Sequence, residues 1–308
     1  MNYPTYDLSN HQSRCKKTTR KRLLTRVAEK VLEPDVSPLL SKGLDIVGDI
    51  AIVKLPESLV SKGSKIGQTI LDEVPYIKVV LNQITPVSGE FRTRKFDWLA
   101  GEKRTITIHK EYGCQYKVDL KTAYFSPRLS HERMRIAELV KREFDKNKKL
   151  EVVTNLFAGV GCFSILIAKH SLTGKIYSID INPDAIRMMK ENVVLNRVAK
   201  QVIPILGDAR KVVESNLKHV ADRVLMPLPE HAIEFLDTAL TTLKPEGGWL
   251  HYQDFAHARK SKDSIKESAE KFITEMDKFK VDFEIMNSRV IRDVGPHWFH
   301  ITLDVFIK

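Results

Sequence analysis

The chain has 308 residues, 43% of them hydrophobic, which is enough for two domains with apolar cores. No apolar run approaches the roughly 18 residues of a membrane span, and the N-terminus lacks the apolar core of a secretory signal. We therefore expect a cytoplasmic protein without membrane contact, and a monomer. The cysteines at positions 15, 114 and 162 lack C-x-x-C spacing, which predicts reduced thiols and no metal site.

The formal net charge of +11 is unevenly distributed along the chain. Residues 1–30 carry a net +6, residues 31–89 a net −2 and residues 90–149 a net +7, which leaves residues 150–308 neutral. A basic first half and a neutral second half are typical of a polyanion-binding module joined to a module for a small ligand. For any single basic run, solvated surface is the ordinary alternative.

The first half predicts a basic segment followed by a small α+β domain. Within residues 1–44, the segment Arg14–Lys30 is strongly basic and has apolar residues at helical spacing, which predicts an amphipathic helix. Residues 45–147 contain short alternating runs separated by turn residues, which predicts a largely antiparallel sheet. The expected strands cover 48–53, 77–81, 104–109 and 116–120, and a helix is expected over 131–147.

Residues 148–308 alternate between strand and helix patterns. Strands are predicted at 150–154, 175–179, 201–206, 223–226 and 249–252, and helices at 163–169, 183–195, 232–243 and 261–278. This order predicts an α/β fold with a doubly wound, mostly parallel Rossmann-like sheet. Strong strand patterns at 283–290 and 298–307 predict a terminal antiparallel hairpin, as in class I methyltransferases.

A nucleoside site is predicted after the first of these strands. Gly159 and Gly161 allow a sharp turn and a close approach of the backbone to a ligand. Asp180 follows nineteen residues after Gly161 at the end of the second strand, where a carboxylate can accept both ribose hydroxyls. Ser164 occupies the third position of G-x-G-x-x-G, which favours S-adenosylmethionine over a dinucleotide.

Two further loops lie at the same predicted edge of the sheet. Asp208, before Ala209, either reaches the exocyclic amine of adenine or caps the helix that follows it. Pro227 and Pro229 follow the fourth strand and fix a rigid backbone beside the transferred group. For this pair of prolines, a plain turn is the alternative.

Several motifs occur together in one order and identify a family. They are Gly89-Glu90-Phe91-Arg92, Ile108-His109-Lys110-Glu111-Tyr112-Gly113, Tyr124-Phe125-Ser126-Pro127-Arg128-Leu129 with Glu132-Arg133, Phe157-Ala158-Gly159-Val160-Gly161, Ile179-Asp180-Ile181-Asn182-Pro183 and Leu228-Pro229. On these residues the chain resembles the archaeal and eukaryotic type of tRNA (guanine-37-N1) methyltransferase over about residues 45–308. It resembles the wybutosine aminocarboxypropyl transferase almost as much.

The resemblance implies a tRNA-modifying enzyme that acts on the anticodon loop with S-adenosylmethionine. By resemblance, Glu132 is the base for the N1 proton of guanine, Arg92 stabilises O6, and Arg128 positions the anticodon loop. An ion pair with Arg128 is the alternative for Glu132, and a phosphate contact is the alternative for Arg92. The cofactor-binding residues it implies are Phe157, Gly159, Gly161, Asp180, Ile181, Asn182, Asp208 and Ala209.

Two departures from the methyltransferase pattern leave the substrate open. Pro227 stands where that family usually has asparagine, and Asn155 where it usually has aspartate. The first choice is methyl transfer to the guanine 3′ of the anticodon. Transfer of 3-amino-3-carboxypropyl to a tricyclic wybutosine intermediate is the alternative enzyme, and a non-catalytic RNA-binding protein is the alternative class. The intact set of Gly159, Gly161, Asp180, Asp208 and Glu132 favours an enzyme.

Overall fold

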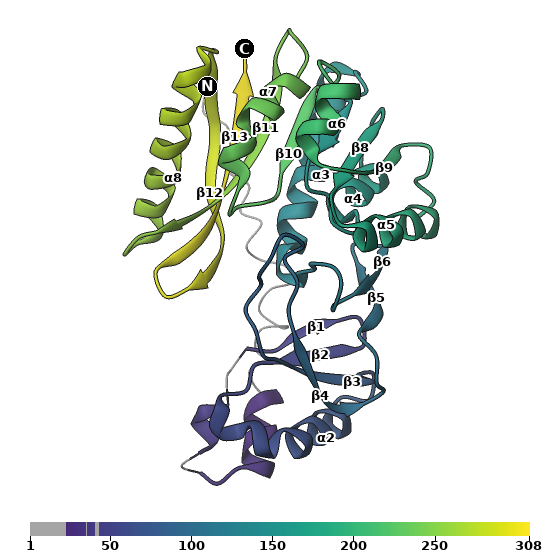
Figure 1. Cartoon of the computed structure of the whole chain (residues 1–308), viewed down its shortest axis with the longest axis vertical. Coiled ribbons are helices and arrows are strands. Elements are labelled where there is room, and N and C mark those ends of the chain that lie inside the picture. The colour runs from purple at the N-terminus through teal and green to yellow at the C-terminus, as the bar shows by residue number, and fades with distance from the viewer. Residues whose placement is uncertain (1–22, 35, 41–42) are drawn as a thin grey trace. The chain divides into compact units, whose positions relative to one another are not determined.

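A computed structural model describes residues 23–34, 36–40 and 43–308 (Figure 1). It divides into two compact units. The first contains the described residues up to His109 together with Asp119–Lys121, and the second contains Lys110–Val118 and Thr122–Lys308. This division differs from the predicted limit after residue 147, because helix α3 (Ser130–Asn147) packs against α4 (Cys162–His170) and belongs to the second unit.

The first unit is built on a four-stranded sheet in the order β1-β2-β3-β4. Its strands are β1 (Asp45–Val47), β2 (Ile50–Val53), β3 (Val79–Gln83) and β4 (Phe96–Gly101), and only the β2–β3 pair is parallel. Between β2 and β3 lie the 3-10 turn η3 (Glu57–Lys62) and α2 (Gly63–Glu73), and the 3-10 turn η2 (Ser37–Leu39) precedes β1. Residues 23–31 are helical, and the earlier part of the predicted N-terminal helix lies outside the described residues.

Aliphatic side chains form the core of the first unit. Leu23, Leu24 and Val27 of the basic helix pack with Ile66 and Ile70 of α2. The apolar spacing that predicted this helix therefore places these residues in the core, as expected of an amphipathic segment.

A separate two-stranded sheet consists of β5 (Ile106–Glu111) and β6 (Cys114–Asp119). The sequence placed both strands in the main sheet of the first unit and did not predict β4. In β4 the large side chain of Trp98 is 45% exposed, so this edge strand lacks the clean apolar alternation that marks a half-buried strand. The prediction of a largely antiparallel sheet is correct for two of its three strand pairs.

The second unit contains a seven-stranded sheet in the order β12-β13-β11-β10-β7-β8-β9. Strands β7 to β11 are parallel, and β12 and β13 form the predicted antiparallel hairpin. The strands are β7 (Val153–Asn155), β8 (Ile176–Asp180), β9 (Val202–Leu206), β10 (Arg223–Met226), β11 (Gly248–His257), β12 (Phe283–Gly295) and β13 (Trp298–Ile307). The predicted fold class is confirmed.

Helices lie on both sides of this sheet (Figure 1). Apolar residues of α6 (Ala209–Asn216), α7 (Leu236–Thr242) and α8 (Ser261–Met276) form one core with β10, β11 and β13. Helices α4 and α5 (Pro183–Leu195) contact β8 and β9. Three short 3-10 turns flank the helices. The turn η4 (Pro127–Leu129) precedes α3, η5 (Ala232–Phe235) precedes α7, and η6 (Asp277–Phe279) follows α8.

Candidate active site

The loop after β7 has the backbone geometry of a ligand cradle. Gly159 and Gly161 have φ angles of 57° and 91°, in the left-handed region that favours glycine. A Cβ on Gly161 would lie 2.7 Å from Cγ of Met189, so a side chain is excluded there by packing. A Cβ on Gly159 would meet only the carbonyl oxygen of Tyr124, at 4.0 Å. Gly159 therefore leaves space on the ligand side of the loop.

Asp180 closes this loop from the end of β8. Its Oδ2 accepts a hydrogen bond from the backbone N–H of Gly159 at 2.6 Å, and its Oδ1 accepts one from Asn182 at 2.9 Å. Burial raises the pKa of this carboxyl, while the two N–H donors act in the opposite direction. A carboxylate has about four lone-pair sites, so two acceptor positions stay open to ribose hydroxyls.

Asn155 and Ser164 join the glycine loop to the sheet interior. The Asn155 amide donates to Oγ of Ser164 at 3.3 Å, and its Oδ1 accepts from the backbone N–H of Phe157 at 3.3 Å. Ser164 also accepts from Oγ of Ser178 at 2.8 Å. An aspartate at position 155 could not donate this hydrogen bond to Ser164. The asparagine at position 155 and the serine in the third glycine position therefore form one buried hydrogen-bonded pair.

The residues predicted to bind the cofactor also include an exposed apolar side chain and two helix caps. Ile181 is 39% exposed, and Leu206, which the sequence did not single out and which pairs with Asp180 across β8 and β9, is 54% exposed, so both offer apolar surface to a flat ring. Asn182 caps α5 through its Oδ1 and donates to the carbonyl of Thr122 at 2.7 Å. Asp208 caps α6, with Oδ1 accepting from the N–H of Lys211 at 3.1 Å, while Ala209 is buried. Asp208 therefore caps α6, which is one of the two roles that the sequence left open for it.

Phe157 and the prolines after β10 border the same edge of the sheet. The Phe157 ring meets Phe235 edge-on, with centroids 4.9 Å apart. Pro227 is partly exposed and Pro229 is buried. Between them, the carbonyl of Leu228 accepts from two N–H groups of the turn that leads into η5, so this segment is a defined turn at the end of the strand.

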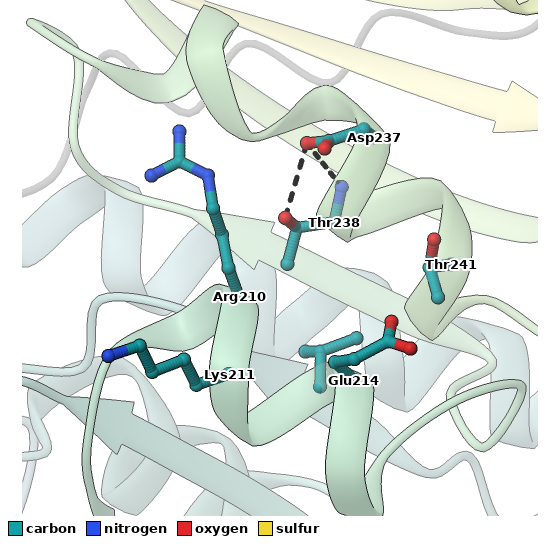
Figure 2. A pocket seen from close by; sticks show the side chains of 7 residues that line it. Arg210, Lys211, Glu214, Asp237, Thr238 and Thr241 are labelled. Carbon is teal, nitrogen blue, oxygen red and sulfur yellow. Dashed lines mark hydrogen bonds between the residues drawn. The ribbon is translucent and has the colours of Figure 1, made fainter.

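A pocket of about 280 Å³ is lined by residues of α6 and α7 (Figure 2). Its charged side chains are of both signs, and Asp237 accepts from the N–H of Thr238 at 2.6 Å. The pocket is lined by Arg210, Lys211, Val213, Glu214, Asp237, Thr238 and Thr241. None of the predicted cofactor residues lines it, so it is not part of the predicted site.

Glu132 is buried in α3, and both oxygens of its carboxylate bond to an arginine. Both oxygens accept from Arg135, at 2.6 and 2.9 Å, and the Glu132 side chain is 0% exposed. Arg135 makes a second bidentate contact with Asp304 of β13, at 2.5 and 3.0 Å. A guanidinium nitrogen of Arg289 in β12 lies 3.8 Å from Oε2 of Glu132. The predicted base is therefore fixed between helix α3 and the C-terminal hairpin.

The contact with Asp304 continues as a buried row of polar groups across the sheet. Nδ1 of His251 in β11 bonds to Asp304 at 2.6 Å, and its Nε2 bonds to a guanidinium nitrogen of Arg223 at 2.5 Å. Because a guanidinium only donates, Nε2 accepts and the Nδ1–H donates, which identifies a neutral imidazole. Arg223 ends the row in a bidentate pair with Glu151, at 2.7 and 2.9 Å.

Arg133, the residue after Glu132, anchors the segment that carries Arg128. It is buried and pairs with Glu111 at 2.6 and 2.7 Å, and it donates twice to the carbonyl of Ser126 at 3.2 Å. Arg128 itself is exposed in η4. A fixed Ser126 therefore holds the turn from which Arg128 projects.

Arg92 belongs to the first unit, in the loop between β3 and β4. It has a left-handed backbone with φ of 53°, and its N–H donates to the carbonyl of Gly89 at 3.0 Å. Of the five predicted catalytic residues, Arg92 lies in the first unit, and Glu132, Arg128, Pro227 and Pro229 lie in the second. In the part of the chain that the structure describes, no group of His, Cys, Asp and Glu could hold a metal, and no helix is long and apolar enough to span a membrane.

Comparison with known proteins identifies the family. Residues 107–284 match the TRM5/TYW2 methyltransferase domain, and residues 24–105 match the TYW2 N-terminal domain. The first match alone covers more than half of the chain. The chain belongs to the TRM5/TYW2 methyltransferase family.

Relatives of this family match nearly the whole chain. The tRNA (guanine(37)-N(1))-methyltransferase Trm5b of Pyrococcus abyssi is 39% identical over 86% of this chain and 74% of its own length. The solved complex of aTrm5 with tRNALeu has a TM-score of 0.76 at 33% identity, over 98% of this chain and 82% of that one. TYW2 of P. horikoshii, solved in complex with MeSAdo, has a TM-score of 0.74 at 28% identity, over 93% of this chain and 98% of that one.

Membership of the TRM5/TYW2 family confirms the predicted enzyme class and S-adenosylmethionine as the cofactor of that class. The geometry fits this cofactor, since an open glycine turn faces a carboxylate with free lone pairs. Sequence reasoning did not find Arg135, Asp304, His251 or Arg223. A signal exists for His251 and Asp304, because polar residues recur at alternate positions of β11 (His251, Gln253) and β13 (His300, Thr302, Asp304) within otherwise apolar strands.

Proposed function

We propose that this TRM5/TYW2 protein is a tRNA (guanine-37-N1) methyltransferase, which transfers a methyl group from S-adenosylmethionine to the guanine 3′ of the anticodon. The observation that carries this proposal is the 39% identity with a Trm5b enzyme across 86% of the chain. The complex of the relative aTrm5 with tRNALeu supports tRNA as the partner. A monomer is part of the same proposal.

The cofactor supplies an electrophilic methyl group when it is bound. Asp180 would accept its ribose hydroxyls, Ile181 and Leu206 would pack against adenine, and the open side of Gly159 would leave room for the ligand. Phe157, Asn182, Asp208 and Ala209 would complete the pocket, mainly by shaping its loops. Pro227 and Pro229 would hold a rigid turn beside the reacting groups.

Glu132 would remove the N1 proton of guanine. Arg135 occupies one pair of its lone-pair sites, and a carboxylate retains others that can accept a proton. Because the side chain is buried, substrate binding would have to open this position. Arg92 would stabilise the charge that develops on O6, and Arg128 would orient the anticodon loop.

Aminocarboxypropyl transfer is the second candidate, and a specific observation favours it. Residues 24–105 match the TYW2 N-terminal domain, and TYW2 of P. horikoshii covers 93% of the chain. In addition, Pro227 has no side-chain amide with which to bind a guanine edge. The two reactions leave different nucleosides: S-adenosylhomocysteine after methyl transfer and methylthioadenosine after aminocarboxypropyl transfer.

Product analysis tests the proposal directly. The purified protein is incubated with cofactor and with two tRNAs, one carrying guanosine at position 37 and one carrying the tricyclic intermediate, followed by mass spectrometry. We expect N1-methylguanosine and S-adenosylhomocysteine with the first tRNA. Methylthioadenosine as the nucleoside product would replace the proposal with its alternative. Binding of tRNA without either product would contradict both.

A further inference from the structure

Three aromatic rings gather at the tip of the β12–β13 hairpin. The His257 ring lies 5.0 Å from the Trp298 ring and 6.2 Å from the His297 ring, measured between centroids. His257 pairs with Trp298 in the β11–β13 register, and the N–H of Ala258 donates to the carbonyl of His297 at 2.9 Å. We call the rings of His257, His297 and Trp298 the tip cluster.

The tip cluster projects from the edge of the sheet that carries the cofactor loop. Strand β10 ends at Met226, which pairs with Tyr252, and the parallel strand β11 continues from there to His257. At about 3.3 Å per residue, this extension reaches roughly 16 Å beyond the carboxyl end of β10. In open α/β sheets, ligands bind beyond the carboxyl ends of the strands. The tip cluster therefore lies on the substrate side of the sheet.

Trp298 is an uncovered apolar surface. It is 46% exposed, and His257 and His297 are exposed too. Its partner on the other strand is Gly295, which has no side chain to cover the indole. The His257 ring lies beside the indole, and nearly half of the Trp298 side chain remains open to solvent. The hairpin thus presents part of an aromatic ring to solvent.

The charge around the tip cluster is positive. Residues 257–260 and 292–298 contain three Lys or Arg against one Asp, although residues 150–308 as a whole are neutral. Arg259 and Lys260, directly after β11, are exposed. Aromatic rings with adjacent cations are the combination that single-stranded nucleic acid requires, because bases stack on the rings and phosphates pair with the cations.

We propose that the tip cluster is a stacking platform for an unpaired base of the RNA substrate, with Trp298 as its main surface and Arg259 and Lys260 as phosphate contacts. The inference rests on the proposed function in that it takes tRNA as the partner. It goes beyond that function because it assigns the C-terminal hairpin to RNA binding. A protein partner or a second copy of the chain would bury the indole equally well, but neither explains the concentration of cations beside it.

Equilibrium binding of full-length protein to a tRNA transcript tests the platform. Trp298→Ala should weaken tRNA binding by roughly 5- to 140-fold, the range for loss of one base–aromatic stack. Trp298→Phe should restore most of the affinity. Met286→Ala is the matched control, because Met286 is a 53% exposed apolar residue on the same hairpin without a ring. His297→Ala provides a second exposed variant should Trp298→Ala fail to fold.

A fluorescent base separates stacking from other losses of affinity. With 2-aminopurine in the anticodon loop, the wild type should quench the fluorescence, and Trp298→Ala should restore it. Unchanged tRNA affinity and unchanged quenching in both Trp298→Ala and His297→Ala would overturn the platform. The platform would also be overturned if Trp298→Ala changed only the self-association of the protein, measured by sedimentation, and left tRNA binding unchanged. These binding measurements need no turnover. If the wild type transferred no methyl group, the proposed function would be contradicted, but the binding data would still decide whether Trp298 stacks on a base.

Discussion

The two units differ in where they keep their charges. The first unit has an aliphatic core, and its ion pairs, such as Asp49–Arg104 with side chains 34% and 29% exposed, face solvent in part. The second unit buries a row of charged groups joined through the neutral imidazole of His251, which runs from Glu132 through Arg135, Asp304 and His251 to Arg223 and Glu151. Similar residue types therefore perform different tasks in the two units.

Burying charged groups costs desolvation free energy, so the buried row in the second unit is expected to serve a purpose other than stability. Removing ions from water costs several kcal/mol each, and well-packed apolar residues in their place are often equally stable. What a fully bonded buried row offers is fixed geometry. Here the fixed end of the row is Glu132, the proposed base. Fixed polar contacts in the second unit are thus concentrated around the proposed chemistry, whereas the first unit is stabilised by aliphatic packing.

The largest expected effect concerns Glu132. Glu132→Gln keeps the shape of the side chain but cannot take up a proton, so single-turnover methylation should fall by roughly 10²–10⁴-fold. Affinity for cofactor and tRNA should stay nearly constant, because Asp304 still pairs with Arg135. Glu138→Gln, on the exposed side of α3 beside Arg142, is the matched control and should be fully active. A fully active Glu132→Gln enzyme would remove Glu132 from the mechanism.

The next effect tests the contrast between the units directly. Arg135→Ala leaves the buried carboxylates of Glu132 and Asp304 without their shared cation, so the free energy of unfolding should fall by about 3–5 kcal/mol. Arg104→Ala breaks the partly exposed pair of the first unit and should cost about 1 kcal/mol or less. Urea titrations of both variants give these values. Equal losses of unfolding free energy in the two variants would show that the buried row contributes no more to stability than the partly exposed pair.

A smaller effect is expected for cofactor binding. Asp180→Ala removes a charged acceptor for the ribose hydroxyls and the partner of the Gly159 N–H, which should weaken S-adenosylmethionine binding by about 1.5–3 kcal/mol. Asp184→Ala, four residues later and paired with Arg187 on the surface, is the control. Titration calorimetry measures both dissociation constants. Identical values for the two variants would mean that the cofactor binds elsewhere.

The smallest effect concerns acid stability. Burial lowers the pKa of His251 from its usual 6.5, against the opposing influence of Asp304. Below about pH 6.5 the unfolded chain therefore binds a proton that the folded imidazole does not, and stability falls as the pH decreases. The slope should approach at most about 1.4 kcal/mol per pH unit.

His251→Gln should flatten this slope between pH 5 and 6.5, because a glutamine amide can bond to both Asp304 and Arg223 without titrating. Denaturant titrations at several pH values measure it. An identical slope in the variant would assign the acid sensitivity to other groups.

The sequence by itself predicted most strands and helices of the second unit and the glycine loop after β7. Gly159, Gly161 and Asp180 could be placed because backbone conformation and strand ends are local properties, encoded within a few residues of each position. The helix Pro183–Leu195 and the strand Trp298–Ile307 match their predicted limits for the same reason, since Asn182 caps the helix and the strand follows the turn at Pro296.

Only the tertiary structure decided which elements share a unit and which charges share a row. Helix α3 follows the first half in sequence but packs on α4, so the predicted division after residue 147 separates it from the unit to which it belongs. Arg135 and Asp304 are 169 residues apart and meet because β13 crosses back antiparallel to β11. Such contacts depend on strand order and on the burial of whole faces, which are set by long-range packing and leave at most an alternation of polar residues in the local sequence.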